Sequence, residues 1–450
     1  MVGARGIRPE RAAGGEGSTL SGGMPTGGLS LEQAPHLSIP ASFFLTVPAS
    51  VLLAGAILLF TGEASLSHPW NPQAIALTHV GTVGVLLMGM IGALYQMTPV
   101  VAGTPVAAIR IAHGVHVLLL AGLVCFVWRL LGGPAFAMTL AIYSLGMALL
   151  GFLLPVGWSL ARSATRDETT LGMRLAVASL AALAAMGLLM APGYAESGFP
   201  ENRFLWTQVH LTLALLGWVG GLIVSVSWQV VPMFYLAPSP PKRSRQVLLG
   251  ALVAGLILPF AAFAMQTNND VAMSPSRLAA VAALPAALAV WFFHPLLTLH
   301  SIHQRKRKRS DASLLFWRAG LASALLLIPL AAMASLTIDH RWQILFGWLA
   351  IWGWAGIILH GMLTRIVPFL VWFHRITPLI GKQHVPSIRG LLSQRRIKIG
   401  FSIHLTSLVL GAAAIVAQSD ILARMTGVAL VATGISLASA LVHVLYRRIP

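Results

Sequence analysis

The chain has 450 residues, of which 57% are hydrophobic and only 9% are charged. Soluble domains carry about 25% charged residues, so this composition excludes a soluble protein and predicts an integral membrane protein. The formal net charge is +18, but Lys and Arg occur in short runs between long apolar stretches. That pattern excludes nucleic acid as a partner and predicts a lipid bilayer instead. The single cysteine, Cys125, excludes intrachain disulfides and cysteine-based metal sites, which leaves 15 histidines as candidate ligands.

Residues 1–41 are rich in Gly, Ser and Pro and are predicted to form a disordered cytoplasmic tail. Beyond them we expect an all-α polytopic fold, because a bilayer core of about 30 Å needs about 20 apolar residues per helix. Twelve such runs lie near 43–60, 75–98, 111–131, 135–160, 173–190, 205–231, 247–265, 278–299, 314–336, 343–370, 399–416 and 426–445. They are numbered below as spans 1 to 12.

The basic residues predict the orientation of these spans. All but five of the 30 Lys and Arg residues lie in the tail, or in or next to the connections that follow even-numbered spans. The exceptions are Arg129, Arg203, Arg277, Arg341 and Arg424. By the positive-inside rule both termini are expected to be cytoplasmic.

Spans 2, 6 and 10 share a pattern that predicts internal repeats. They end at Pro99, Pro232 and Pro368, which are 133 and 136 residues apart, and a glycine precedes each proline by 15 residues. A tryptophan lies just outside each of the three spans, where an amphipathic ring anchors a helix end. We therefore expect three pseudo-threefold four-helix repeats, over residues 42–170, 171–310 and 311–450.

Three four-helix arcs, with the second helix of each at the centre, resemble the haem–copper oxidase subunit I superfamily. The segment 89–99, GMIGALYQMTP, is similar to the corresponding helix of bacterial nitric oxide reductases and of the NnrS proteins. The segments 99–103, PVVAG, and 229–234, QVVPMF, extend the resemblance to NnrS.

The resemblance implies that His79 of span 2 ligates haem and that His210 of span 6 ligates copper or haem. These histidines precede their prolines by 20 and 22 residues, which places both near the non-cytoplasmic surface. Neutral imidazole is a good donor to either metal. The alternative interpretation is that each of these histidines lies at a helix end, capped or hydrated, and binds no metal or haem.

The chain departs from the superfamily in two spans. Span 10 has no pair of haem-binding histidines, since 346–354 reads FGWLAIWGW, and span 7 has no histidine. We therefore do not expect a conventional oxygen-reducing terminal oxidase.

Four further histidines lie towards the cytoplasmic side and suggest an alternative haem or metal site: His113, His116, His360 and His404. His113 and His116 are three residues apart and can share a helix face. The alternative interpretation is that each is bonded to a carbonyl or lies near lipid headgroups.

Other polar and aromatic side chains also fall within the spans. Gln96, Gln229 and Arg365 occupy one position in the three repeats, three residues before each proline. They are expected either to hold a propionate or to satisfy backbone groups that the proline frees. Trp348 and Trp352 share a face of span 10 and either stack on a porphyrin or fill space.

Two functions are consistent with this sequence. The first is a haem- or copper-binding, redox-related inner-membrane protein resembling NnrS, which acts in nitric oxide metabolism with a respiratory-chain or electron-transfer partner. The second is a cofactor-free subunit, assembly factor or channel on the same scaffold.

Overall fold

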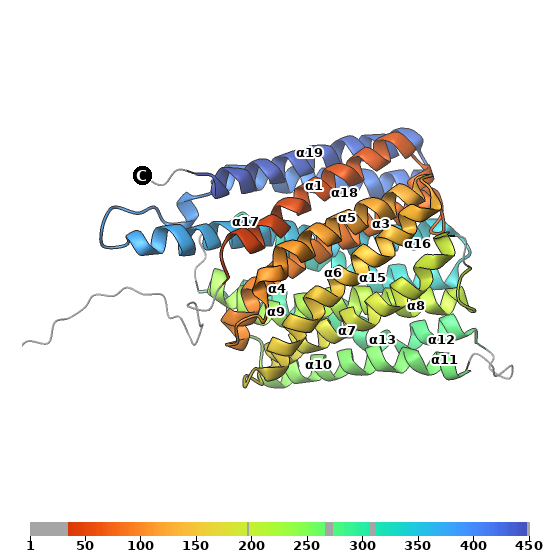
Figure 1. Cartoon of the computed structure of the whole chain (residues 1–450), viewed down its shortest axis with the longest axis horizontal. Helices are drawn as coiled ribbons and strands as arrows, with labels where there is room; N and C mark the ends of the chain where they lie inside the picture. Colours follow the sequence, from red (N-terminus) through yellow and green to blue (C-terminus); the bar gives the residue numbers. More distant parts are fainter. Residues whose placement is uncertain (1–34, 196–197, 266–272, 307–310, 448–450) are drawn as a thin grey trace, which may run out of the picture.

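The computed structural model describes residues 35–195, 198–265, 273–306 and 311–447, and all regular secondary structure in these ranges is helical. Twelve helices are long and apolar enough to cross a membrane, which confirms the predicted all-α, twelve-span architecture. They form one bundle of roughly aligned helices (Figure 1).

The first four spans are α1 (Ser38–Thr61), then α3, η2 and α4 (Pro72–His79, Val80–Leu87, Met88–Ala102), η3 and α5 (Ile109–Ile111, Ala112–Leu130), and α6 (Ala135–Arg162). The next four are α7 and η4 (Glu168–Met190, Ala191–Ala195), then α8, η5 and α9 (Arg203–Thr212, Leu213–Gly220, Gly221–Tyr235), α10, η6 and α11 (Lys242–Ile257, Leu258–Phe260, Ala261–Met265), and α13, η7 and α14 (Leu284–Leu288, Ala289–Phe293, His294–His303). The last four are α15 (Ser313–Leu336), then α16, η8, α17, η9 and η10 (His340–Trp348, Leu349–Gly356, Ile357–Val371, Trp372–Ile376, Thr377–Leu379), α18 (Gln394–Ala417), and α19 (Asp420–Leu445). Short helices α2 (Ala64–Ser67), α12 (Pro275–Ala282) and η11 (Ile388–Gly390) lie outside these spans.

The predicted N-terminal tail ends earlier than expected. Residues 1–34 lie outside the described residues, but α1 already begins at Ser38, so 38–41 are helical rather than tail. Hydropathy places the first apolar run near Phe43, but it does not specify the residue at which the helix begins.

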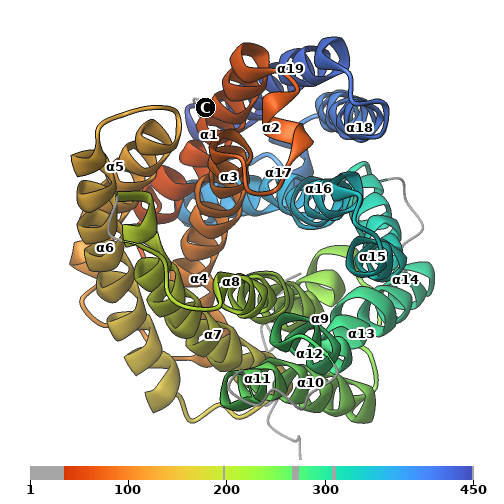
Figure 2. The same ribbon diagram turned by 90° about the vertical axis from the view of Figure 1, so that its right-hand side faces the viewer.

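Spans 2, 6 and 10 occupy the centre of the bundle. Their most apolar windows are 72%, 78% and 78% buried inside the protein, whereas the other nine spans range from 28% to 61%. Figure 2 views the bundle along its helices and shows α4, α8 and α17 inside an outer ring. In each group of four spans the first packs along the second: α1 on η2 and α4, α7 on η5 and α9, and α15 on η8 and α17.

Each central span contains a π-helical segment at a matching position. The segments η2, η5 and η8 are eight residues long and end at Leu87, Gly220 and Gly356, with the same offsets of 133 and 136 residues that separate the prolines. Each is followed by a 15-residue α-helix that contains the proline. Wide helical turns are frequent at functional sites, which directs attention to the space that these segments enclose.

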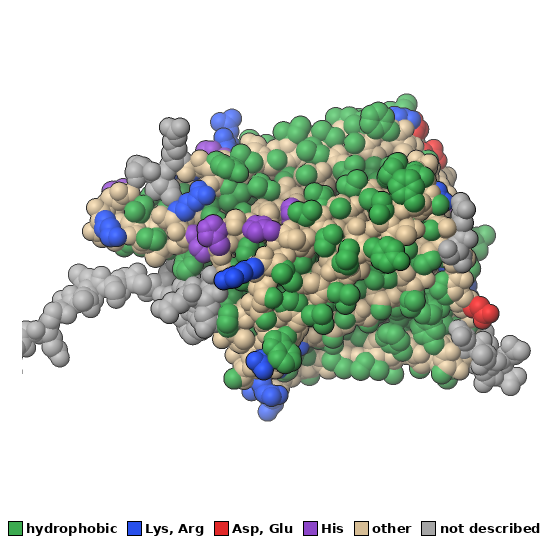
Figure 3. Space-filling view, in the orientation of Figure 1, with side chains coloured by type: hydrophobic (Ala, Val, Ile, Leu, Met, Phe, Trp, Pro, Cys, Tyr) green, Lys and Arg blue, Asp and Glu red, His purple; other side chains and the backbone are tan. Residues whose placement is uncertain are grey.

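The two ends of the bundle differ in charge. Figure 3 shows Lys and Arg gathered where the described chain ends, acidic side chains at the opposite end, and a largely hydrophobic flank between them. We call the first end, which holds Arg162, Lys242 and Arg375, the basic end. The other, which holds Trp70, Arg203 and His340, is the mouth end.

Candidate functional site

A cavity of about 1160 Å³ occupies the mouth half of the bundle. All three π-helical segments contribute to its wall, through residues such as Val85, Leu215 and Trp352. The wall is mostly apolar and rich in aromatic rings. Ligand pockets typically occupy about 300–1,000 Å³ and are mostly apolar, so this cavity has room for a large organic ligand.

His79 lines the cavity from the end of α3. Its Nδ1 lies 2.8 Å from the carbonyl oxygen of Ile75, to which it can only donate, and its ring packs 4.7 Å from that of Phe126. The Nδ1–H tautomer leaves Nε2 with a free lone pair. Metal-ligating histidines commonly have this arrangement, because the second hydrogen bond orients the ring.

His210 lines the same cavity from the end of α8. It lies close enough to His79 for the two rings to interact electrostatically, and it contacts the backbone of Leu183. Its Nδ1 is buried and has no hydrogen-bond partner among the described residues. The structure therefore brings together the two histidines that the sequence analysis placed at matching depth.

Arg203 stands at the mouth of the cavity inside a cage of aromatic rings. Its guanidinium lies 3.8 Å from the ring centroid of Phe199 and 4.4 Å from that of Trp70, and Nη2 donates to the hydroxyl of Tyr194 at 2.8 Å. No described carboxylate forms an ion pair with it. These cation–π contacts hold the charge in place while leaving it available to an anionic group.

A second pair of histidines lies at the mouth end, outside the membrane-spanning helices or at their start. The rings of His68 and His340 meet edge to face with centroids 4.2 Å apart. Desolvation, together with the nearby His340, lowers the pKa of His68. Only His340 of the two lines the cavity.

Trp348 and Trp352 also line the cavity, and both are anchored to span 11. Trp348 Nε1 donates to the carbonyl of Leu408 at 3.0 Å, and Trp352 Nε1 donates to Ser407 Oγ at 2.9 Å. Trp352 stacks on His404 with centroids 3.9 Å apart and planes 12° apart. One face of Trp352 is therefore occupied by protein, and the indole separates the cavity from His404.

His360 and His404 form a buried pair behind this tryptophan. His404 Nε2 donates to the carbonyl of Trp352 at 3.2 Å, so its Nδ1 accepts from His360 Nδ1 at 3.1 Å. The other ring nitrogen of His360, Nε2, faces the backbone of Gly400. A Cβ atom added to this glycine would lie 3.4 Å from that nitrogen. Neither histidine of this pair lines the cavity.

His113 and His116 lie elsewhere and bond to span 1. His113 Nε2 is 3.4 Å from Ser38 Oγ, and His116 Nε2 is 2.7 Å from Thr46 Oγ1. The expected site that combines them with His360 and His404 does not form. No group of three or more His, Cys, Asp or Glu side chains in the described parts of the chain could hold a metal ion.

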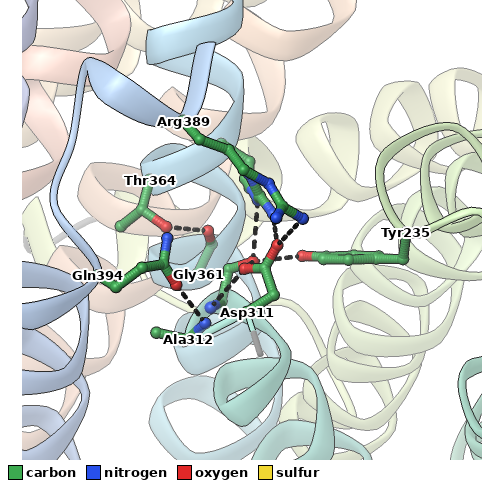
Figure 4. Close-up of polar contacts among 9 residues, drawn as sticks. Tyr235, Asp311, Ala312, Gly361, Thr364, Arg389 and Gln394 are labelled. Atoms are coloured by element: carbon green, nitrogen blue, oxygen red, sulfur yellow. Dashed lines mark hydrogen bonds and ion pairs between the residues drawn. The ribbon is translucent and has the colours of Figure 1, made fainter. Parts of the chain in front are cut away.

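Arg365 pairs with a carboxylate rather than with a propionate or with the backbone groups that the proline frees. Its guanidinium contacts Asp311 and lies 3.0 Å from Ser313 Oγ, while Arg389 Nη2 is 3.4 Å from the same carboxylate. Figure 4 shows Asp311 between Arg389 and Tyr235, with Gln394 bonded to the amide of Ala312. This Asp311 cluster joins spans 6, 9, 10 and 11 at the basic end.

The two glutamines at the position of Arg365 behave differently from each other. Gln96 is buried, and neither its amide nitrogen nor its oxygen has a partner among the described residues, whereas Gln229 is half-buried. The predicted capping of freed carbonyls is therefore not seen for Gln96. An unpaired buried amide costs about 1–3 kcal/mol unless a water molecule satisfies it.

Sequence reasoning missed Asp311, the Arg203 cage and the wall residue Trp291. Asp311 lies in a connection, and only the fold reveals that it turns inward to Arg365. The position of Arg203, as the one Lys or Arg of its connection and close to Trp206, is the signal that could have identified it.

No protein-family model matches this chain, and no curated protein sequence matches it significantly.

Proposed function

We propose that this chain is a haem-binding, redox-related membrane protein whose mouth cavity holds the cofactor. One observation carries the proposal: two histidines on neighbouring central helices face one aromatic-lined cavity, and each retains a ring nitrogen that is not used within the protein. Buried polar groups are normally paired, so unpaired nitrogens beside a cavity indicate a ligand.

The residues of the cavity have distinct parts in this proposal. The Ile75 carbonyl accepts a hydrogen bond from Nδ1 of His79 and so orients its ring, while His210 would supply a second nitrogen from span 6. Phe126 and Trp352 would help to exclude water from the cavity, and Arg203 would offer its charge to carboxylates at the mouth. Haem bound there would supply one-electron and gas-binding chemistry.

The donor set favours haem over copper. Protein copper sites generally use three or more side-chain ligands, and no such group exists among the described residues. Haem would need only one or two protein ligands, which His79 and His210 would supply.

The resemblance to NnrS makes nitric oxide the expected small ligand, with a respiratory-chain or electron-transfer protein as partner. The charge asymmetry of the two ends supports an orientation with the basic end in the cytoplasm, so the cavity would open away from it. The resemblance implies that the membrane is a bacterial inner membrane.

A reduced-minus-oxidised visible spectrum of the purified protein, with iron and copper measured on the same sample, tests the proposal. We expect stoichiometric iron and a sharp reduced haem band that is lost in His79→Ala and in His210→Ala. Exogenous imidazole restores the band in His79→Ala, because a free imidazole fits the space that the side chain leaves.

The matched control is His300→Ala, an exposed histidine outside the cavity, which keeps the band. A flat spectrum and no iron after expression with ample haem would contradict the proposal. The alternative, a cofactor-free subunit, assembly factor or channel, would then stand. One feature favours that alternative: Trp348 and Trp352 fill the part of span 10 where the superfamily has its histidines, and both are bound to span 11.

A further inference from the structure

The central cavity is enclosed by outer spans that meet at three seams, between spans 4 and 5, 8 and 9, and 12 and 1. Two of these seams are closed at the mouth end. Span 12 packs along the whole of span 1, and Asp420 accepts a hydrogen bond from the amide of Glu63 at 3.0 Å. Span 4 packs on η4 of span 5, and beside it Arg129 Nε donates to the carbonyl of Tyr194 at 2.8 Å.

The seam between spans 8 and 9 is different. In the basic half, α15 packs against α14 and η7. In the mouth half, α12 and α13 have no comparable packing against α15 among the described residues. Span 9 is also the least buried of the twelve, with 28% of its window inside the protein.

Most of the residues that line the cavity on the two sides of this seam are small. On one face of α15 they recur at helical spacing: Ala331, Ala332 and Ser335, together with the larger Ile328. The other side contributes Ala280, Ala283 and Ala287. Ala332 and Ser335 are exposed as well as cavity-lining, so the cavity reaches the outer surface of the bundle here. Methyl groups leave a gap that larger side chains would fill.

We propose that this seam is a lateral portal through which a lipid-dissolved amphiphile with a flat ring head and an apolar tail enters the cavity from the bilayer. Arg277 of α12 lies at the mouth end of this seam, and the residues between it and the middle of the bundle, such as Ala283, Ala287 and Ala331, are uncharged, which favours entry of uncharged molecules. Inside, Trp291, Phe346 and Trp348 offer faces on which a ring can stack.

The polar groups of the cavity fit the same ligand class. Gln208, Gln343, Thr207 and Ser276 are uncharged hydrogen-bonding side chains in the wall, suited to ring carbonyls or hydroxyls. The tail would lie between α12 and α15, where Val281 and Leu336 are exposed. This inference goes beyond the proposed function and does not require haem.

Photolabelling in phosphatidylcholine nanodiscs tests the portal. The probe is decylubiquinone with a diazirine in its ten-carbon tail, and mass spectrometry locates the labelled residues in haem-free protein. We expect labels on the cavity face of α15 and on α13, and competition by unlabelled decylubiquinone. Ala332→Phe and Ser335→Phe, which narrow the portal, lower the labelling of the cavity severalfold.

The matched control is Ala322→Phe, an exposed alanine of the same helix that does not line the cavity, which leaves the labelling unchanged. Labels confined to lipid-facing residues outside the cavity would overturn the proposal. So would cavity labelling that neither narrowing variant reduces, since the probe would then enter through the aqueous mouth. Since the sample contains no haem, failure of the haem proposal does not alter this readout.

Discussion

The buried ionisable groups of the mouth half and of the basic half have different surroundings, although Gln96 and Nδ1 of His294 in the basic half also lack a partner among the described residues. In the basic half, Asp311 contacts two arginines, His360 pairs with His404, and His294 Nε2 lies 2.9 Å from Ser227 Oγ. In the mouth half, His79 and His210 each keep a nitrogen without a protein partner beside an open cavity.

This difference shows that an intramembrane histidine does not by itself indicate a ligand site. Polar groups in a bilayer are costly and are therefore commonly paired, and such pairs hold helices together. A ring nitrogen that remains unpaired next to a cavity does not hold helices together in this way. The comparison predicts that variants of the basic half lose stability, whereas variants of the mouth half lose ligand binding.

The largest effect is expected from Asp311→Ala. Removing this carboxylate leaves the buried Arg365 guanidinium without its counter-ion, and breaking one side of a buried ion pair costs about 3–5 kcal/mol. Thermal unfolding in detergent, followed by size-exclusion chromatography, measures the loss. The double variant Asp311→Asn/Arg365→Gln recovers part of it, because no buried charge remains unpaired.

Arg341→Gln is the control for that prediction, since its ion pair with Asp339 lies at the surface and the change leaves Asp339 in place as the N-cap of α16. Solvent screens this pair, so the variant is expected to unfold at the same temperature as the parent. Equal losses for Asp311→Ala and Arg341→Gln would remove the distinction between the two halves.

His404→Phe is expected to have the next largest effect on stability. It leaves Nδ1–H of His360 buried without an acceptor, which costs about 1–3 kcal/mol. The haem band of the proposed function is retained, because Trp352 separates this pair from the cavity. Loss of the band with unchanged stability would mean that the inner pair, not the mouth pair, binds the cofactor.

His79→Ala and His210→Ala are expected to change the unfolding temperature less than His404→Phe does. Each side chain lines an open cavity, so its removal leaves no large unfilled space in a packed core. Chemical unfolding of haem-free protein isolates this effect from the stabilisation that a bound ligand would add. A loss as large as that of His404→Phe would assign these histidines a structural role.

The smallest effect is a pH dependence at the mouth end. Because desolvation and His340 lower the pKa of His68 from 6.5, the folded state binds fewer protons there than the unfolded state. Stability is then complete above about pH 6.5 and falls as the pH drops through the interval between the unfolded pKa and the lower folded pKa. In His68→Asn we expect the unfolding temperature to change less with pH between about 5 and 8. An unchanged pH profile would exclude His68 as the source of the pH dependence.

Several features of the fold could be predicted from short segments of the chain. Hydropathy predicts the twelve spans, and the spacing of Pro99, Pro232 and Pro368 singles out the central helices that the structure shows to be most buried. The same spacing recurs in the π-helical segments, which no local pattern indicated. The depth of His79 and His210 was readable as well, because rise along a helix follows directly from residue number.

The sequence by itself therefore determined how many helices cross the membrane, which ones lie at the centre and how deep each histidine sits. Only the tertiary structure decided which histidines face the cavity and which are paired, that Asp311 turns inward to Arg365, and that spans 8 and 9 separate at the mouth. The physical reason is that hydropathy and helical rise are local properties of the chain. Pairings such as that of His360 with His404 depend on the rotation and packing of separate helices, which local patterns do not specify.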